Sequence, residues 1–142
     1  MASKFSAFLS QNVEKIENVK VVVSNRFKDE NGEPIEWEIR AISSEENDNL
    51  QRKAMVNTAV AGQRGQFTRE LDQIKYVGLL LSASVVYPDL NDAELQDSYG
   101  VKTPEALLKR MLYAKEEELL AKKVMAISEM DELNVLVDKA KN

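Results

Sequence analysis

Two residue types that carry much of protein chemistry are absent from this sequence of 142 residues, which contains no cysteine and no histidine. Without cysteine there is no disulfide, no thiolate nucleophile, no zinc ribbon and no iron–sulfur cluster. Without histidine there is no Ser-His-Asp or Cys-His catalysis, and most transition-metal sites lose their usual ligand. These absences exclude whole classes of enzyme and metal site.

Long apolar runs and an excess of positive charge are missing as well. The longest apolar run, residues 77–86, is interrupted by Ser82 and Ser84 and is about half as long as a membrane-spanning helix. The first residues are not followed by the apolar stretch of an export signal. The net charge is −5, so the chain gains nothing from counterion release on nucleic acid. We therefore expect a soluble cytoplasmic protein with neither a nucleic-acid nor a membrane partner.

The composition that remains is that of an ordinary globular protein. Hydrophobic residues make up 44% of the chain and charged residues 30%, which is typical of a folded chain. The length suits one domain, which we take to span residues 1–142. At its start, apolar residues recur every three or four positions, as on one face of a helix: Phe5, Phe8, Leu9, Val13 and Ile16. This segment is either a short helix on the core or an arm that docks on a partner.

Two segments with alternating apolar side chains, residues 19–27 and 35–41, predict a β-hairpin. A three-residue loop over residues 30–32, with Gly32 in the left-handed region, pairs Asp29 with Glu33. This register keeps the apolar positions of both strands on one face. The opposed pairs are then Phe27 with Ile35, Val23 with Ile39 and Val21 with Ala41, and we expect Phe27, Ile35 and Trp37 to face the core. Residues 66–71 also alternate and could add a third strand.

Capping residues predict the helices that follow. Ser43 and Glu46 form a capping box for a helix over residues 44–57, and Asp72 caps a helix that runs to residue 86. Asn91 and Glu94 form a second capping box, for a short helix that ends at Gly100. Thr103 as N-cap, followed by Pro104, begins a further helix. Amphipathic stretches after residue 114 and over residues 131–141 complete the helical part.

The predicted fold class is therefore α+β. An N-terminal β-hairpin or three-stranded antiparallel sheet is followed by a mostly helical C-terminal two-thirds. Within the single domain, residues 1–71 form the hairpin-containing part and residues 72–142 form the helical part.

No group of residues forms a catalytic, cofactor-binding or metal-binding motif. Glu36 and Glu38 share one strand face, and a solvated strand face explains them without acid–base chemistry. Residues 92–113 resemble a helix-turn-helix unit. Its second helix begins Thr-Pro-Glu-Ala, where a DNA-reading helix needs basic or amide side chains. We therefore expect no enzyme, no cofactor and no metal, and we keep a small acidic DNA-associated regulator that uses residues 92–113 as the alternative function.

Several segments together carry a recognisable family pattern. The most specific are the hairpin with Trp37, residues 23–40, and the stretch Ala-Ser-Val-Val-Tyr-Pro-Asp-Leu, residues 83–90, followed by Ala-Glu-Leu-Gln-Asp-Ser-Tyr-Gly-Val, residues 93–101. The other matching segments extend the pattern over almost the full length: Phe8-Leu9 with Asn12, residues 67–76, Leu107-Leu108 with Met111-Leu112, and residues 140–142. Together these segments resemble the XkdN-like tail assembly chaperones of long-tailed bacteriophages and prophages. The family usually has a turn containing Pro and Gly after the Met-Leu helix. Here residues 114–117 are Ala-Lys-Glu-Glu, so we expect the two helices around them to be joined or only slightly kinked.

The resemblance implies a non-catalytic, ATP-independent chaperone. Such a protein binds the tape measure protein, keeps it soluble in the host bacterial cytoplasm during tail assembly, and is absent from the mature virion. In related systems an extended form of the chaperone recruits the tail tube protein. Self-association is a further partner interaction that we expect.

The two C-terminal apolar stripes are our predicted partner-binding site, because burying a client helix needs an extended apolar groove. The other interpretation is that both stripes belong to the core. The residues of the predicted site are Leu119, Leu120, Val124, Ile127, Leu133, Leu136 and Val137.

Overall fold

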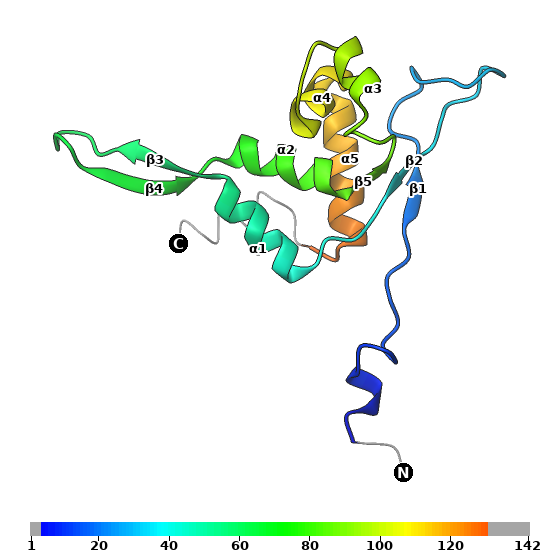
Figure 1. The fold of residues 1–142 in the computed structure, drawn as a ribbon, viewed down its shortest axis with the longest axis horizontal. Coiled ribbons are helices and arrows are strands. Elements are labelled where there is room, and N and C mark those ends of the chain that lie inside the picture. Colours follow the sequence, from blue (N-terminus) through cyan, green and yellow to red (C-terminus); the bar gives the residue numbers. More distant parts are fainter. Residues whose placement is uncertain (1–3, 131–142) are drawn as a thin grey trace.

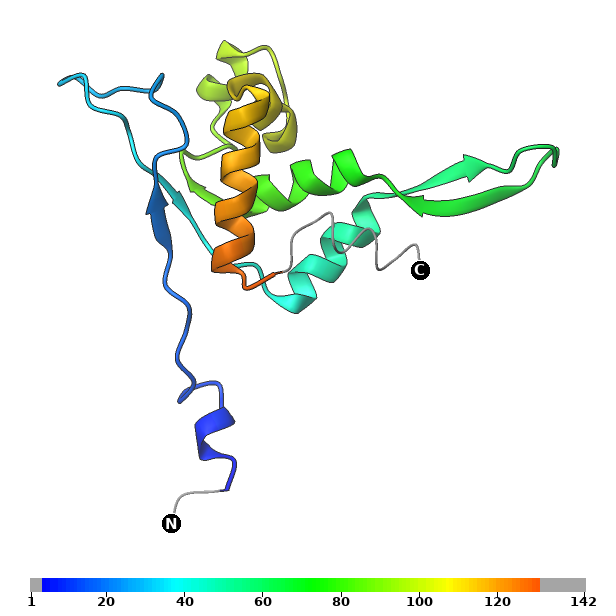
Figure 2. The ribbon, with the colours of Figure 1, turned by 180° about the vertical axis from the view of Figure 1, so that it is seen from behind.

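A computed structural model describes residues 4–130 of the chain. Its centre is helix α2 (Gln73–Ser84), which packs against α1 (Ser44–Lys53), α4 (Pro104–Met111) and α5 (Ala114–Ile127). The N-terminal segment and a two-stranded ribbon extend away from this body in different directions (Figures 1 and 2). The predicted last helix, residues 131–141, lies outside the described residues.

A three-stranded antiparallel sheet lies beside the helices, with strand order β1-β2-β5. Strands β1 (Val19–Val21) and β2 (Trp37–Ile39) come from the predicted hairpin, and β5 (Val85–Tyr87) follows α2 without a loop. The α+β fold class is therefore confirmed. The third strand, however, is contributed by the segment after α2 and not by residues 66–71, so the sheet joins both parts of the chain.

The tip of the hairpin has the predicted register, but its base does not. The Asp29 amide donates to the Glu33 carbonyl at 2.9 Å, the Ile35 amide donates to the Phe27 carbonyl at 2.8 Å, and Gly32 has φ +78°. Further along, Val21 pairs with Trp37 and Val19 with Ile39, so the predicted pairs of Val23 with Ile39 and Val21 with Ala41 are wrong. Residues 22–26 leave the strand, with the Arg26 amide donating to the Ser24 hydroxyl at 3.1 Å.

Residues 54–72 form a second, separate β-ribbon, in which β3 (Met55–Ala59) pairs with β4 (Phe67–Leu71). Helix α1 therefore ends at Lys53 and not at Asn57, and residues 66–71 pair locally instead of extending the hairpin sheet. At the base of the ribbon the Asp72 amide donates to the Ala54 carbonyl at 2.9 Å. The two strands are close in sequence, and the short loop of residues 60–66 joins them at a low cost in chain entropy, which favours this local pairing.

Most helix starts agree with the capping prediction. The hydroxyl of Ser43 accepts the Glu46 amide, Asp72 accepts the Lys75 amide, and Thr103 accepts the Ala106 amide. For α3 (Ala93–Ser98) the cap is Asp92 and not Asn91, because the Asp92 carboxylate accepts the Leu95 amide at 2.9 Å. Helix α2 ends at Ser84, two residues early, since residues 85–87 pair with β2.

Helices α4 and α5 are two separate helices, so the expectation that they are joined is wrong. Leu112 and Tyr113 both have extended backbone, with ψ angles of 143° and 163°. The Glu116 carboxylate accepts the Tyr113 amide at 2.8 Å and so begins α5. Neither a proline nor a glycine is required for the break, because the capping contact and burial of Leu112 fix the chain direction.

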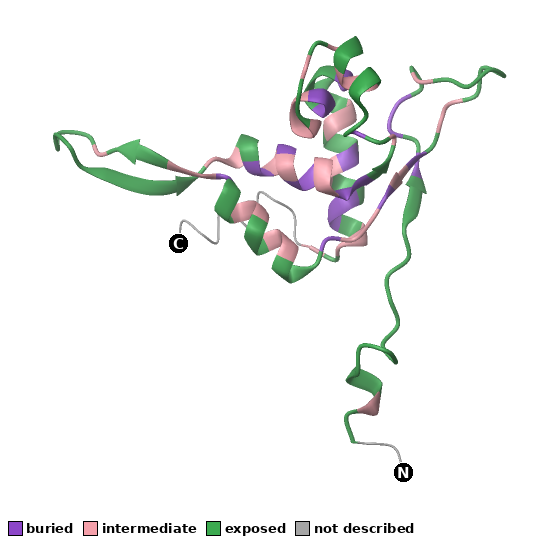
Figure 3. Ribbon diagram, viewed as in Figure 1, coloured by how far each residue is buried: buried purple, intermediate pink, exposed green. Residues whose placement is uncertain are grey.

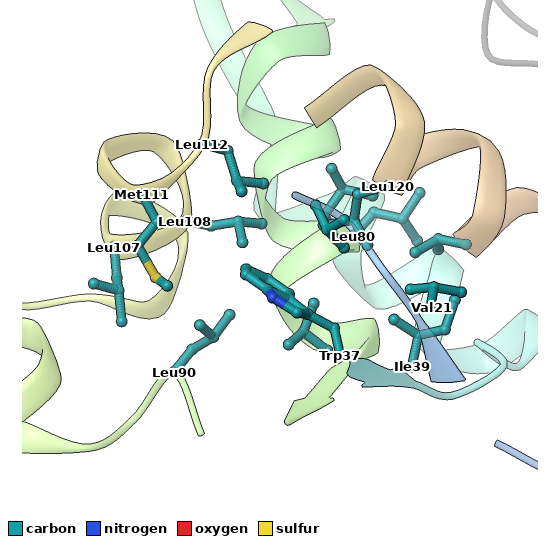
Figure 4. Packing of buried hydrophobic residues seen from close by; sticks show 14 of the residues in the cluster. Val21, Trp37, Ile39, Leu80, Leu90, Leu107, Leu108, Met111, Leu112 and Leu120 are labelled. Atoms are coloured by element: carbon teal, nitrogen blue, oxygen red, sulfur yellow. The ribbon is translucent and has the colours of Figure 1, made fainter. Parts of the chain in front are cut away.

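The core lies between the sheet, α2, α4 and α5 (Figures 3 and 4). Its largest fully buried side chains come from all four: Trp37, Ile39, Tyr76, Leu80, Leu81, Leu107, Leu108, Leu120 and Val124. Phe27 is half-buried, with its ring 5.8 Å from that of Trp37. Within the described residues, no helix combines the length and apolarity needed to cross a membrane.

Candidate functional site

The carboxylates considered for acid–base chemistry lie apart from any catalytic grouping. Glu38 accepts a hydrogen bond from Asn18 Nδ2 at 3.0 Å, and Glu36 is exposed. In the described part of the chain, His, Cys, Asp and Glu nowhere gather in a group of three that could hold a metal ion. The other candidate sites in the described chain are its exposed apolar surfaces.

Helix α5 divides the predicted C-terminal site between core and surface. Leu120 and Val124 are fully buried, and Ile127 packs partly buried against the core. Leu119 alone among these four is exposed, at 38%. It borders a shallow depression of about 220 Å³ that is lined by Val23, Lys115, Glu116, Glu118, Leu119 and Lys122. Leu133, Leu136 and Val137 lie outside the described residues.

Arg26 holds Glu116, one of the residues that line this depression, in place. Its Nε and Nη2 atoms donate to the Glu116 carboxylate at 3.0 and 2.6 Å, and Nη2 also donates to the Met111 carbonyl at 2.7 Å. The guanidinium lies 5.0 Å from the Phe27 ring centre and 4.7 Å from that of Tyr113. Arg26 lowers the pKa of Glu116 to about 2, because the paired guanidinium favours the charged carboxylate.

The N-terminal segment is an arm rather than a helix packed on the core. From Lys4 to Asn18, the only helical part is a single 3₁₀ turn, η1 (Ser6–Phe8), and nearly every residue from Lys4 to Lys20 is exposed. The arm extends beyond the sheet in both views (Figures 1 and 2). Its predicted apolar stripe is open to solvent, with exposed fractions of 41–79% for Phe5, Phe8, Leu9, Val13 and Ile16. Such a stripe is typical of a segment that binds a partner.

The β3–β4 ribbon is the second exposed surface, and sequence reasoning missed it. Every residue from Ala61 to Leu71 is exposed, including Phe67 at 66% (Figure 3). Ile74, at the start of α2, is 73% exposed. The alternation of residues 66–71 signalled a strand, but residues 54–57 continue the helical pattern of α1 and so concealed its partner.

The helix-turn-helix-like unit is built into the body. Helix α4 buries Leu107, Leu108 and Met111, and Lys109 donates to the Glu117 carboxylate of α5 at 2.7 Å. Glu105 occupies the first turn of α4. The residues that begin α4, Thr-Pro-Glu-Ala at positions 103–106, include no basic or amide side chain that could read a base, so no observation favours the DNA-associated alternative.

Comparison with known proteins identifies the family. The model of the phage XkdN-like tail assembly chaperone protein family matches residues 5–141. This chain belongs to the XkdN-like phage tail assembly chaperones.

Two proteins of Bacillus subtilis (strain 168) are similar to this XkdN-like chaperone over almost their whole length. The phage-like element PBSX protein XkdN is 29% identical over 139 residues, covering 96% of this chain and 93% of that protein. The uncharacterized protein YqbN is 30% identical over 139 residues, covering 96% and 92%. The crystal structure of a YqbN protein has the same fold, with a TM-score of 0.75 at 23% identity over 92% of this chain and all of that one.

Proposed function

We propose that this tail assembly chaperone binds the tape measure protein and keeps it soluble in the bacterial cytoplasm until the tail tube assembles. The observation that carries the proposal is the N-terminal arm, whose five large apolar side chains are 41–79% exposed. An exposed arm with helical apolar spacing can fold against a client helix and bury its stripe there. The action is non-catalytic and independent of ATP, and the chaperone is absent from the mature virion.

Leu119 is the second contact in this proposal. It is the exposed member of the α5 stripe, and the depression beside it is open to an incoming apolar side chain. Leu133, Leu136 and Val137 extend the same stripe in the sequence. The fully buried Leu120 and Val124 support α5 from within. An extended form of the chain would in addition recruit the tail tube protein.

Co-expression tests the proposal directly. The tape measure protein is produced alone, with the wild-type chaperone, and with a Phe8→Ser/Leu9→Ser variant, and its soluble fraction is measured after centrifugation. We expect the wild type to raise the soluble fraction severalfold and the arm variant to abolish the gain. The control is Gln11→Ser, at an exposed position of the same arm but outside the stripe, which should behave as wild type. An insoluble tape measure protein in the presence of wild-type chaperone would contradict the proposed function.

A further inference from the structure

The β3–β4 ribbon lacks a covering surface. It extends from the body between α1 and α2 (Figure 1), and residues 61–71 within it are exposed (Figure 3). A two-stranded ribbon is only marginally stable by itself in water. Contact with another surface along one face would stabilise it.

One face of the ribbon carries both apolar and cationic side chains. Phe67, Arg69 and Leu71 alternate along β4 and so share a face. Phe67 is 66% exposed and Leu71 is 39% exposed. Among the described residues, Arg69 and the loop residue Arg64 take part in no ion pair. An exposed aromatic side chain beside unpaired arginines is the composition of a protein–protein hot spot.

A matching depression lies on the body, away from the ribbon. It encloses about 180 Å³ between the hairpin, the end of β5 and α3, and its lining is mainly apolar: Phe27, Ile35, Trp37, Tyr87, Pro88, Leu95 and Met111. This volume is below the roughly 300–1,000 Å³ of typical small-molecule sites. It suits a single inserted side chain better than a metabolite.

The ribbon and the depression also differ in charge. Residues 52–75, which contain the ribbon, have five basic and two acidic side chains, although the whole chain carries −5. Residues 28–38 and 89–98, which contribute much of the depression, together have nine acidic side chains and one lysine. Glu36 and Glu94 neighbour the lining residues Ile35 and Leu95, are exposed, and form no hydrogen bond or ion pair within the described chain.

We propose that the ribbon of one copy docks in the depression of a second copy, with Phe67 inserted and Arg64 and Arg69 facing its carboxylates. The two surfaces lie in different parts of the molecule (Figure 1), so the contact is heterologous and joins copies head to tail into rings or open chains. The contact area is small and its charges are exposed. The association is therefore weak, dependent on concentration and suppressed by salt.

Sedimentation of the purified chaperone alone tests this inference without any client. At about 10 mM salt the average mass of the wild type should rise with concentration, and at about 1 M salt it should fall to that of a monomer. Phe67→Ser should weaken the association by about tenfold or more. Its melting temperature should stay near that of the wild type because Phe67 is exposed.

Two charge-reversal variants make the test specific. Arg64→Glu/Arg69→Glu places acids on the ribbon, and Glu36→Arg/Glu94→Arg places bases at the depression. Each variant alone should be monomeric at low salt, because its ribbon and its depression carry charge of the same sign. An equimolar mixture should associate as the wild type does, because the ribbon of each variant then meets a depression of opposite charge on the other. Glu14→Arg/Glu17→Arg on the arm changes the net charge equally and should leave association intact.

Three results would overturn the inference. The first is a wild type that stays monomeric at every concentration in low salt. The second is a mixture of the two reversal variants that does not associate. The third is a ribbon variant that loses tape measure binding while the wild type alone is monomeric, because the ribbon would then be a client site and not a site for a second copy.

Discussion

Arg26 connects the hairpin to two helix ends that lie far along the chain. Its guanidinium bridges the hairpin to the end of α4 and the first turn of α5, 85 and 90 residues away. The planar fork of arginine suits this role, because it donates to a carboxylate and a carbonyl at once while its face contacts aromatic rings. Sequence analysis predicts hairpins from local pattern, so it had no signal for a partner so far along the chain. This contact lies in the segment, residues 22–26, where the chain leaves the strand and the register shifts.

Acid should weaken this connection in a defined pH range. The folded-state pKa of Glu116 is about 2, below its ordinary value of 4.5. Its contribution to stability is therefore complete above pH 4.5 and is lost as the pH falls through about 2. We expect Glu116→Gln to lower the melting temperature at pH 7, and the difference from wild type to disappear near pH 2. Glu14→Gln, at an exposed arm position that takes part in no ion pair, serves as the control. A difference that stays constant across this range would contradict the role assigned to the ion pair.

Substitutions at Gly32 test how backbone conformation alone affects the free energy of unfolding. Its φ of +78° lies in the left-handed region, yet no atom lies within 4 Å of the position that a Cβ would occupy. A side chain at this position therefore causes backbone strain but no steric clash. We expect Gly32→Val to lower the free energy of unfolding by about 1–2 kcal/mol, whereas Gly32→Asn should cost less because asparagine tolerates this region. Denaturant unfolding of both variants measures the difference, and equal losses would argue against conformational strain as the cause.

At the scale of elements, α5 presents neighbouring leucines to opposite environments. Leu120 is fully buried and Leu119 is 38% exposed. Leu120→Ala should therefore lower the free energy of unfolding by about 2–5 kcal/mol, through lost burial and an internal cavity. Leu119→Ala should cost about 1 kcal/mol or less. Chemical denaturation of the two variants checks this, and similar losses would mean that α5 does not pack with the face seen here.

The elements that sequence predicts well are those whose ends are fixed locally. The caps at Ser43, Asp72 and Thr103 each bond an amide three residues ahead, so their signals lie within one helical turn. Strands β3 and β5 were missed because each directly continues an apolar or helical pattern, after α1 and after α2. For the candidate site, periodicity identified the apolar stripes of the arm and of α5. It could not decide which stripe is covered, because burial depends on contacts across the whole fold.

At the scale of the whole molecule, the exposed apolar segments and the core are separate. The core is enclosed by the sheet, α2, α4 and α5, whereas the arm and the β3–β4 ribbon extend from it (Figures 3 and 4). This arrangement suits an assembly chaperone, because exposed apolar segments can bind other proteins while the folded body keeps its own stability. Family membership and the two exposed segments therefore both support the proposed binding function.

Removing the arm should separate folding from client binding. None of the residues from Lys4 to Glu17 is buried, whereas Asn18 is tied to β2 through Glu38. A chain that begins at Asn18 should therefore melt within about 2 °C of the full chain, because a change below about 0.5 kcal/mol shifts the midpoint by no more than that. The same chain should fail to keep the tape measure protein soluble on co-expression, since the largest exposed apolar stripe is gone. Thermal denaturation and the soluble fraction of the client are the two readouts. A truncated chain that still solubilises the client would assign binding to Leu119 and the C-terminal stripe instead, and one that melts much earlier would show that the arm contributes to the fold.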